Sequence, residues 1–114
     1  MEDCLFCKII KGEIPSQKIY EDEYVYAFAD IEPQAPFHAI VVPKVHIKSA
    51  NDITCENSIY ISKIFEACAK ICKDNDMCED GYRIVNNCGE FGGQTVGHIH
   101  FHLMGKRHFG WPAG

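Results

Sequence analysis

Hydrophobic and polar residues alternate over several short stretches of this chain. Alternation with a period of two is typical of a β-strand that buries one face. It predicts strands over residues 18–21, 24–30, 38–43 and 81–86, and a last strand within 94–104. Pro43 ends the third of these, because proline cannot donate a hydrogen bond to a neighbouring strand. Residues 87–93 contain three glycines and are predicted to form a turn between the last two strands.

One longer stretch repeats its apolar residues every three or four positions, which predicts a helix over residues 53–74 capped by Asn51 or Asp52. Its apolar stripe comprises Ile61, Ile64, Phe65, Cys68, Ile71 and Cys72. A short helix is predicted over residues 6–11. Strands, one long helix and a final hairpin predict an α+β fold with a mainly antiparallel sheet, in a single domain that spans residues 1–114.

Composition narrows the class of protein. The chain has 114 residues, of which 46% are hydrophobic, as expected for one globular domain. A net charge of −5 gives no basic surface, so nucleic acid is not expected as a partner. The N-terminus is acidic and no long apolar run is present, so neither a signal peptide nor a membrane span is expected. Seven cysteines without an export signal indicate a reducing, cytoplasmic location.

Three histidines stand at every second position of the last predicted strand: His98, His100 and His102. On a strand their side chains share one face, roughly 6.5 to 7 Å apart, while the apolar residues between them enter the core. A solvated polar face is the simpler alternative. Neutral imidazole is a good nucleophile and also a good zinc ligand, with His38 or His46 as a further ligand, and residue types alone leave both possibilities open.

Cys4 and Cys7 form a C-x-x-C pair close to the N-terminus. This spacing occurs in metal knuckles and in redox pairs, and two unrelated free thiols are the third possibility. A redox pair usually follows a strand, and only three residues precede Cys4. Zinc is therefore favoured over redox chemistry.

Two segments resemble a known family. The stretch Gln94-Thr95-Val96-x-His98-φ-His100-φ-His102-φ-φ resembles the signature of the histidine triad nucleotide hydrolases and transferases. The tail Trp111-Pro112-x-Gly114 resembles that of the nucleotide-binding branch, whose members are purine nucleoside phosphoramidases. The resemblance runs from residue 5 to residue 114. It implies a five-stranded sheet with the long helix across one face, and a homodimer whose two sheets join edge to edge.

The resemblance also implies roles for single histidines. His100 matches the nucleophile, which attacks the α-phosphorus, expels an amine or another leaving group, and forms a nucleotidyl-imidazole that water hydrolyses. The second ring nitrogen of such a nucleophile needs an acceptor, usually a backbone carbonyl. His102 matches a phosphate contact, and His38 matches a fourth histidine that packs beside the triad.

Further residues match contacts to a purine nucleotide such as an AMP or GMP conjugate. Asp30 and Ile31 match the pair that holds the ribose and covers the base. The phosphate and leaving-group contacts match Asn87, Gly93, Gln94 and Thr95, and the base pocket matches Phe6, Phe28 and Ile40. Trp111 matches a tail residue that reaches the partner subunit's site.

In relatives with the C-x-x-C pair, the resemblance implies a structural zinc site. Its ligands here are Cys4, Cys7, His46 and His98, which leaves His100 free for chemistry. Gly97 departs from the family pattern, because a large aromatic residue is common at that position. Two other functions stay open: a nucleotide-binding or scaffold protein with little catalysis, and a zinc hydrolase that uses the triad as metal ligands.

Overall fold

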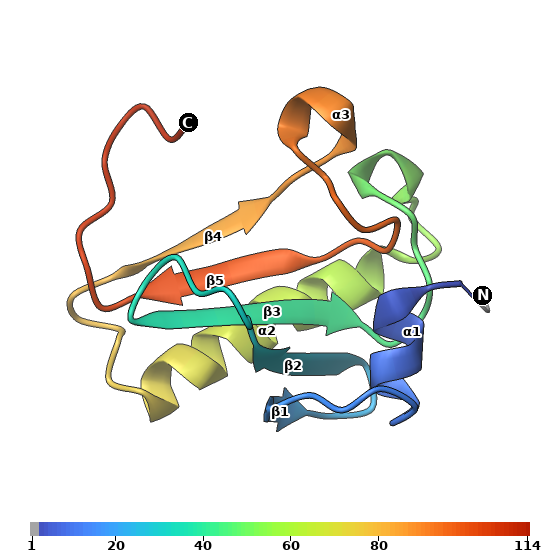
Figure 1. Cartoon of the computed structure of the whole chain (residues 1–114), viewed down its shortest axis with the longest axis horizontal. Helices are drawn as coiled ribbons and strands as arrows, with labels where there is room; N and C mark the ends of the chain where they lie inside the picture. The colour runs from blue at the N-terminus through green and yellow to red at the C-terminus, as the bar shows by residue number, and fades with distance from the viewer. Residues whose placement is uncertain (1–2) are drawn as a thin grey trace.

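The computed structural model describes residues 3–114, which form one five-stranded antiparallel sheet with the strand order β1-β2-β3-β5-β4 (Figure 1). Its strands are β1 (Lys18–Glu21), β2 (Val25–Ala29), β3 (Phe37–Pro43), β4 (Tyr82–Asn86) and β5 (Phe101–Gly105). The predicted α+β class and antiparallel sheet are therefore confirmed. Because β1 and β4 are the edge strands, β3 and β5 lie side by side near the middle of the sheet.

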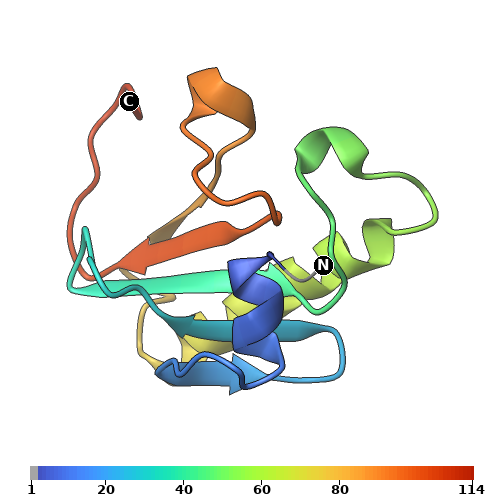
Figure 2. The ribbon, with the colours of Figure 1, turned by 45° about the vertical axis from the view of Figure 1, so that its right-hand side comes forward.

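Helices cover both faces of the sheet. The long helix α2 (Ser58–Asp74) crosses one face, and the short helix α1 (Leu5–Ile10) lies on the opposite face, in front of the sheet in Figure 2. Two single turns complete the described helices, η1 (Ala50–Asp52) and α3 (Gly89–Gly92). No helix in residues 3–114 has the length and apolar character needed to cross a membrane.

The long helix begins later than its apolar period predicts. Residues 50–52 form the separate turn η1, capped by Ser49, whose Oγ accepts a hydrogen bond from the backbone N–H of Asn51. The Asn57 side chain then accepts a hydrogen bond from the backbone N–H of Thr54, so this segment satisfies its polar groups outside a helix. The predicted start at residue 53 and the predicted cap at Asn51 or Asp52 were wrong, and α2 starts at Ser58.

The last strand is also shorter than the histidine spacing predicts. The pairing of β3 with β5 starts at Val41 and Phe101, so His98 and His100 precede the strand. Beyond that point β3 ends at Pro43, and the N–H of Ile99 donates instead to the carbonyl of Ile47. His98 and His100 are therefore held by contacts outside the ladder. The predicted turn at 87–93 likewise contains the single-turn helix α3.

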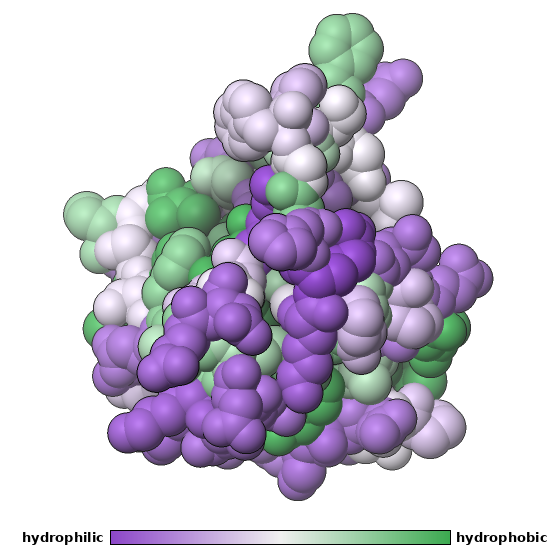
Figure 3. All heavy atoms as spheres, turned by 90° about the vertical axis from the view of Figure 1, so that its left-hand side faces the viewer, coloured by the Kyte–Doolittle hydropathy of each residue, from purple (hydrophilic) through white to green (hydrophobic). Residues whose placement is uncertain are grey.

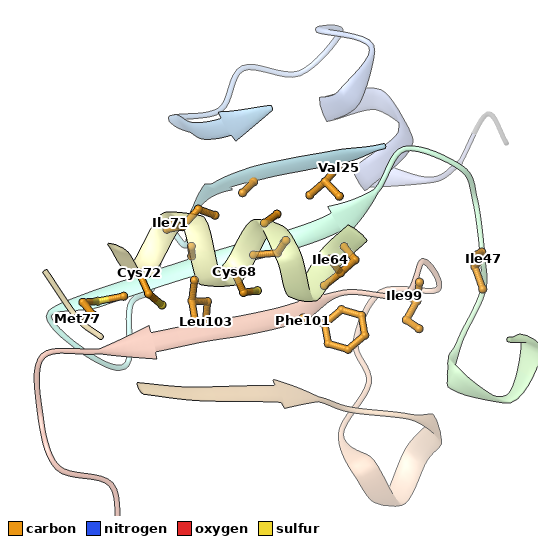
Figure 4. Packing of buried hydrophobic residues seen from close by; sticks show 14 residues of the cluster. Val25, Ile47, Ile64, Cys68, Ile71, Cys72, Met77, Ile99, Phe101 and Leu103 are labelled. Carbon is orange, nitrogen blue, oxygen red and sulfur yellow. The ribbon is translucent and has the colours of Figure 1, made fainter. Parts of the chain in front are cut away.

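The main core lies between α2 and one face of the sheet (Figure 4). Every second residue of the histidine stretch enters it, as predicted: Ile99, Phe101 and Leu103. Four positions of the predicted helix stripe are buried in the same core, Ile64, Cys68, Ile71 and Cys72. Phe65 is an exception, because it remains 49% exposed with its ring against that of Phe101.

A second apolar cluster fixes α1 to the other face. It comprises Phe6, Ile9, Tyr26, Phe28, Ile40 and Val42. The sheet residues of this cluster alternate with those of the main core, because successive residues of a strand point to opposite faces. The histidines share this second face, so α1 becomes one wall of the site.

The packing of Gly105 against Met77 provides a test of the core. A Cβ at Gly105 would lie 2.6 Å from Met77 Sδ, whereas a Cβ at Gly110 would meet nothing within 4 Å. We expect Gly105→Ala to lower the free energy of unfolding by about 1–3 kcal/mol. Gly110→Ala should change it by less than about 0.5 kcal/mol. Denaturant unfolding measures both, and equal stabilities of the two variants would contradict the packing described.

Candidate active site and metal centre

His100 is buried, and a backbone group fixes its protonation pattern. His100 is only 4% exposed, and its Nδ1 lies 2.9 Å from the carbonyl oxygen of His98. A carbonyl oxygen can only accept, so Nδ1 carries the proton and Nε2 keeps its lone pair. The Asn86 side chain on β4 donates to the carbonyl of His100 at 3.0 Å and so holds this backbone in place. The arrangement leaves one imidazole nitrogen free to act as a nucleophile.

His102 has the opposite protonation pattern. The N–H of Gln34 donates to His38 Nδ1 at 3.0 Å, so the proton of a neutral His38 is on Nε2. That Nε2 lies 2.8 Å from His102 Nδ1 and 3.3 Å from Asp30 Oδ2. His102 Nδ1 therefore accepts, and its Nε2–H remains available as a donor.

Burial favours the neutral form of both of these imidazoles. It lowers the pKa of His102 below its ordinary value, and the neighbouring His100 and His38 add to the effect. Burial also lowers the pKa of His38, with Asp30 acting in the opposite direction. The rings of His100 and His102 are 5.3 Å apart, centroid to centroid. The site thus places a free lone pair and a neutral N–H donor side by side, which suits attack on an anionic electrophile.

A hollow of about 700 Å³ opens beside this pair. Most of the nucleotide contacts expected from the resemblance line it: Phe6, Phe28, Asp30, Ile31, Ile40, Thr95 and His102. Its apolar wall includes Phe6 and Phe28, whose rings are 5.7 Å apart with their planes at 64°. The hollow combines an apolar slot with a carboxylate at its edge and two imidazoles at its end.

Other expected contacts lie outside the lining of this hollow. Asn87, Gly93 and Gln94 belong to the connection between β4 and β5. The Gln94 side chain braces that connection, because its amide donates to the carbonyls of Lys48 and Val96 and accepts from the N–H of Gly89. Trp111 is 86% exposed on the C-terminal tail.

Sequence reasoning missed several residues of the site. The segment that leads into β1 contributes Ile14, Pro15, Ser16 and Gln17 to the lining. Gln34 was missed as well, although its backbone N–H decides the tautomer of His38. A backbone contact leaves no signal in a sequence, since any residue other than proline has this N–H.

The four residues expected to hold zinc lie together at one end of the site. The donor atoms of Cys4, Cys7, His46 and His98 are all within 4.8 Å of one another. His98 Nδ1 is 3.2 Å from Cys4 Sγ and 3.5 Å from Cys7 Sγ, and His46 Nδ1 is 3.5 Å from Cys7 Sγ. Tetrahedral zinc, with bonds of about 2.3 Å to sulfur and 2.0 Å to nitrogen, separates such ligands by about 3.5 Å. The donor set and its spacing fit zinc.

His98 is prepared for the role of ligand by its surroundings. It is fully buried, and its Nε2 lies 3.0 Å from the carbonyl oxygen of Pro43, so Nε2 carries the proton. The Nδ1 lone pair therefore points at the thiols. Burial lowers the pKa of His98 to about 4, which keeps the ring neutral. A backbone carbonyl that fixes the tautomer is one of the usual outer partners of a metal-bound histidine.

A second group of donors, Asp30, His38 and His102, is also close enough to contact one ion. It does not fit a metal in this arrangement. The N–H of Gln34 occupies the Nδ1 lone pair of His38, so the Nε2 that faces the other two donors has to carry the proton. The tautomers thus argue against a zinc hydrolase that uses these side chains as ligands.

Comparisons with known proteins agree with the geometry. The model of the HIT domain family matches residues 11–109. The purine nucleoside phosphoramidase of Escherichia coli strain K12 is 43% identical over 109 residues, which cover 96% of this chain and 92% of that protein. The "14 kDa zinc-binding protein" of Zea mays is 45% identical over 115 residues, covering 96% of this chain and 87% of the relative. A HIT family hydrolase from Legionella pneumophila has a crystal structure that superposes with a TM-score of 0.96 at 45% identity, covering 98% of this chain and all of that one.

The candidate zinc site leads to a prediction that can be tested without measuring enzymatic activity. Protein purified without chelator should contain roughly one zinc ion per chain. Cys7→Ser should lose most of it and lower the Tm by more than about 5 °C, because an ion that binds only the folded state stabilises it. Cys55→Ser changes an exposed thiol outside the cluster and should keep both the zinc and the Tm. Wild-type protein with less than about 0.2 zinc per chain by elemental analysis would rule the site out.

Proposed function

Because this chain belongs to the HIT domain family, we propose that it hydrolyses purine nucleoside 5′-phosphoramidates and related nucleotidyl conjugates through a nucleotidyl-histidine intermediate on His100. The observation that carries the proposal is the pair of opposite tautomers. His100 offers a lone pair on Nε2 because its Nδ1–H donates to the carbonyl of His98. His102 offers its Nε2–H because its Nδ1 accepts a hydrogen bond from His38.

In the first step, His100 Nε2 attacks the α-phosphorus, and the P–N bond breaks as the amine nitrogen takes up a proton from solvent and leaves. A positive charge develops on the imidazole ring, and the carbonyl of His98 stabilises it through the Nδ1–H. The Nε2–H of His102 donates to a phosphate oxygen as negative charge grows there. Water then attacks the phosphorus and gives up a proton to solvent, the bond from phosphorus to His100 breaks, and the nucleoside monophosphate is released.

The rest of the hollow binds the nucleoside. Its apolar wall supports binding of a purine, because a flat hydrophobic slot buries the rings of the base without hydrogen bonds. Asp30 supports recognition of the ribose, since a carboxylate accepts from both hydroxyls of a diol. Its Oδ1 already accepts from the N–H of Glu32 at 2.8 Å, which holds the carboxylate at the edge of the hollow.

The zinc centre has a structural role in this proposal. Its four protein ligands, Cys4, Cys7, His46 and His98, leave no open position for substrate. When bound, zinc supplies a crosslink between α1 and the segment before β5. That link supports the placement of Phe6, whose ring lies 5.0 Å from that of His100 and forms part of the base pocket.

A homodimer completes the proposal. The edge strand β4 is rich in β-branched and aromatic residues and is available for pairing with a second copy. Trp111, 86% exposed in one chain, would then lie against the partner's hollow and contact the leaving group.

His100→Ala tests the chemistry. We expect kcat for adenosine 5′-phosphoramidate to fall by more than about 1,000-fold, because the nucleophile is lost. AMP binding should stay within about threefold, since the base and ribose contacts remain. His108→Ala removes an exposed histidine from the tail and serves as the control. A His100→Ala protein that keeps most of its kcat would exclude covalent catalysis, and wild-type protein that binds AMP without turnover would favour a scaffold role.

Removal of residues 111–114 tests the tail. If Trp111 contacts the leaving group, the truncation should change the ratio of kcat/KM between a bulky amine and ammonia by roughly threefold or more. The Tm should move by less than about 2 °C, since these residues are exposed. Phe91→Ala, which removes a fully exposed aromatic ring from α3, is the matched control. An unchanged ratio in the truncated protein would count against a role for the tail.

A further inference from the structure

The loop between β2 and β3 is held from outside the site by an arginine. At the end of β5 the chain turns sharply at Lys106, which has a left-handed φ of +69°. This turn brings Arg107 back toward the loop, where its Nε donates to the carbonyl oxygen of Gln34 at 3.1 Å. Figure 3 shows this side of the molecule, where hydrophilic residues gather in the middle and lower part and hydrophobic residues lie toward the edges.

Gln34 connects this contact to the catalytic histidines. Its carbonyl accepts from Arg107, and its N–H donates to His38 Nδ1 at 3.0 Å. The two groups flank the same Cα, so a restraint on the carbonyl also restrains the direction of the N–H. Inside the loop, Asp30 Oδ1 accepts from the N–H of Glu32, and the Gln34 side chain donates to the Glu32 carbonyl. Arg107 adds a hydrogen bond to this loop from outside it, since Arg107 follows β5.

The direction of that N–H matters because His38 has two tautomers. With the Gln34 N–H on Nδ1, the His38 proton is on Nε2 and is donated to His102 Nδ1. If the N–H moved away, His38 could carry its proton on Nδ1 and present a lone pair to His102. His102 would then have to donate from Nδ1, and its Nε2 lone pair would face the anionic phosphate, which is repulsive.

We propose that Arg107 is a positioning residue for His102: it holds the Gln34 backbone so that His38 keeps the tautomer that leaves an N–H of His102 free for phosphate. The kinetic consequence rests on the proposed function, whereas the tautomers can be measured without it. The contact needs the planar guanidinium, since Nε donates to the loop while Nη1 donates to the carbonyl of His108 at 2.9 Å.

A neighbouring arginine provides a matched control. Arg83 and Arg107 both lie over the ring of Phe109, with Cζ 5.2 and 4.1 Å from its centroid. Arg83 also donates to the carbonyl of Gly110 at 2.9 Å, so it holds the same tail. Arg83 therefore donates to the tail, whereas Arg107 Nε donates to the loop between β2 and β3. Arg83→Met therefore loosens the tail and leaves the contact with the loop.

The experiment compares Arg107→Met, Arg107→Lys and Arg83→Met with the wild type. Two-bond ¹H–¹⁵N correlation spectra report which nitrogen of each histidine carries the proton. Steady-state kinetics use adenosine 5′-phosphoramidate, whose leaving group is too small to depend on the tail. In Arg107→Met we expect His102 to lose its single Nε2–H form while His100 keeps its Nδ1–H. We expect kcat to fall roughly fivefold to tenfold with KM within about twofold, as for one exposed hydrogen bond that acts through a neighbour.

Arg107→Lys should resemble Arg107→Met, because lysine keeps the charge and lacks the guanidinium fork. Arg83→Met should keep the wild-type tautomers, with kcat within about twofold. Wild-type spectra in Arg107→Met would overturn the proposal, as would equal losses in Arg83→Met or full activity in Arg107→Lys. If the wild type has no phosphoramidase activity, the proposed function fails, and the spectra still decide whether Arg107 sets the tautomer of His102.

Discussion

The hydrogen bond between His98 and the carbonyl of Pro43 is the contact on which the rest of the site depends. Because Nε2 of His98 is bound there, its Nδ1 lone pair faces Cys4 and Cys7. The backbone of the same residue offers its carbonyl to Nδ1 of His100. One residue therefore contributes its side chain to the candidate zinc site and its main-chain carbonyl to His100, the proposed nucleophile. A displacement of His98 would change both at once, which couples the fold of the N-terminal segment to the chemistry.

In helix α1, packing and the proposed zinc site would support each other. Cys4 caps the helix by accepting from the N–H of Cys7, so the C-x-x-C spacing places both sulfurs at its first turn. Phe6, between them, points into the apolar cluster on the histidine face. Six residues form a helix that is too short to be stable alone. Burial of Phe6 and Ile9 holds one side of α1, and the cysteines can hold its first turn.

Much of this architecture is readable from the sequence, and the limits have physical causes. The apolar residues between the histidines predicted the core side of the last strand, because a period of two is a local property. Two features of the site are not local. The partner of the His98 ring lies 55 positions away at Pro43, and the partner of His38 is a backbone N–H. Tautomers follow from such contacts, so the row of histidines predicted nucleophile or ligand without deciding which nitrogen acts. The start of α2 was misjudged for a related reason, since side-chain contacts of Asn57 compete with the helix.

The hollow has a further property that bears on turnover. The residues that line it include Asp30 and Glu32, and neither lysine nor arginine is among them. In the proposed reaction, a phosphate there would meet neutral donors, since burial lowers the pKa of His102. Neutral hydrogen bonds are weaker than those from cations, so less of the binding free energy comes from the phosphate and more from the apolar slot. A dianionic product is then held less tightly than a cationic pocket would hold it. In the proposed reaction, the burial that lowers the pKa of His102 would therefore favour release of the nucleoside monophosphate.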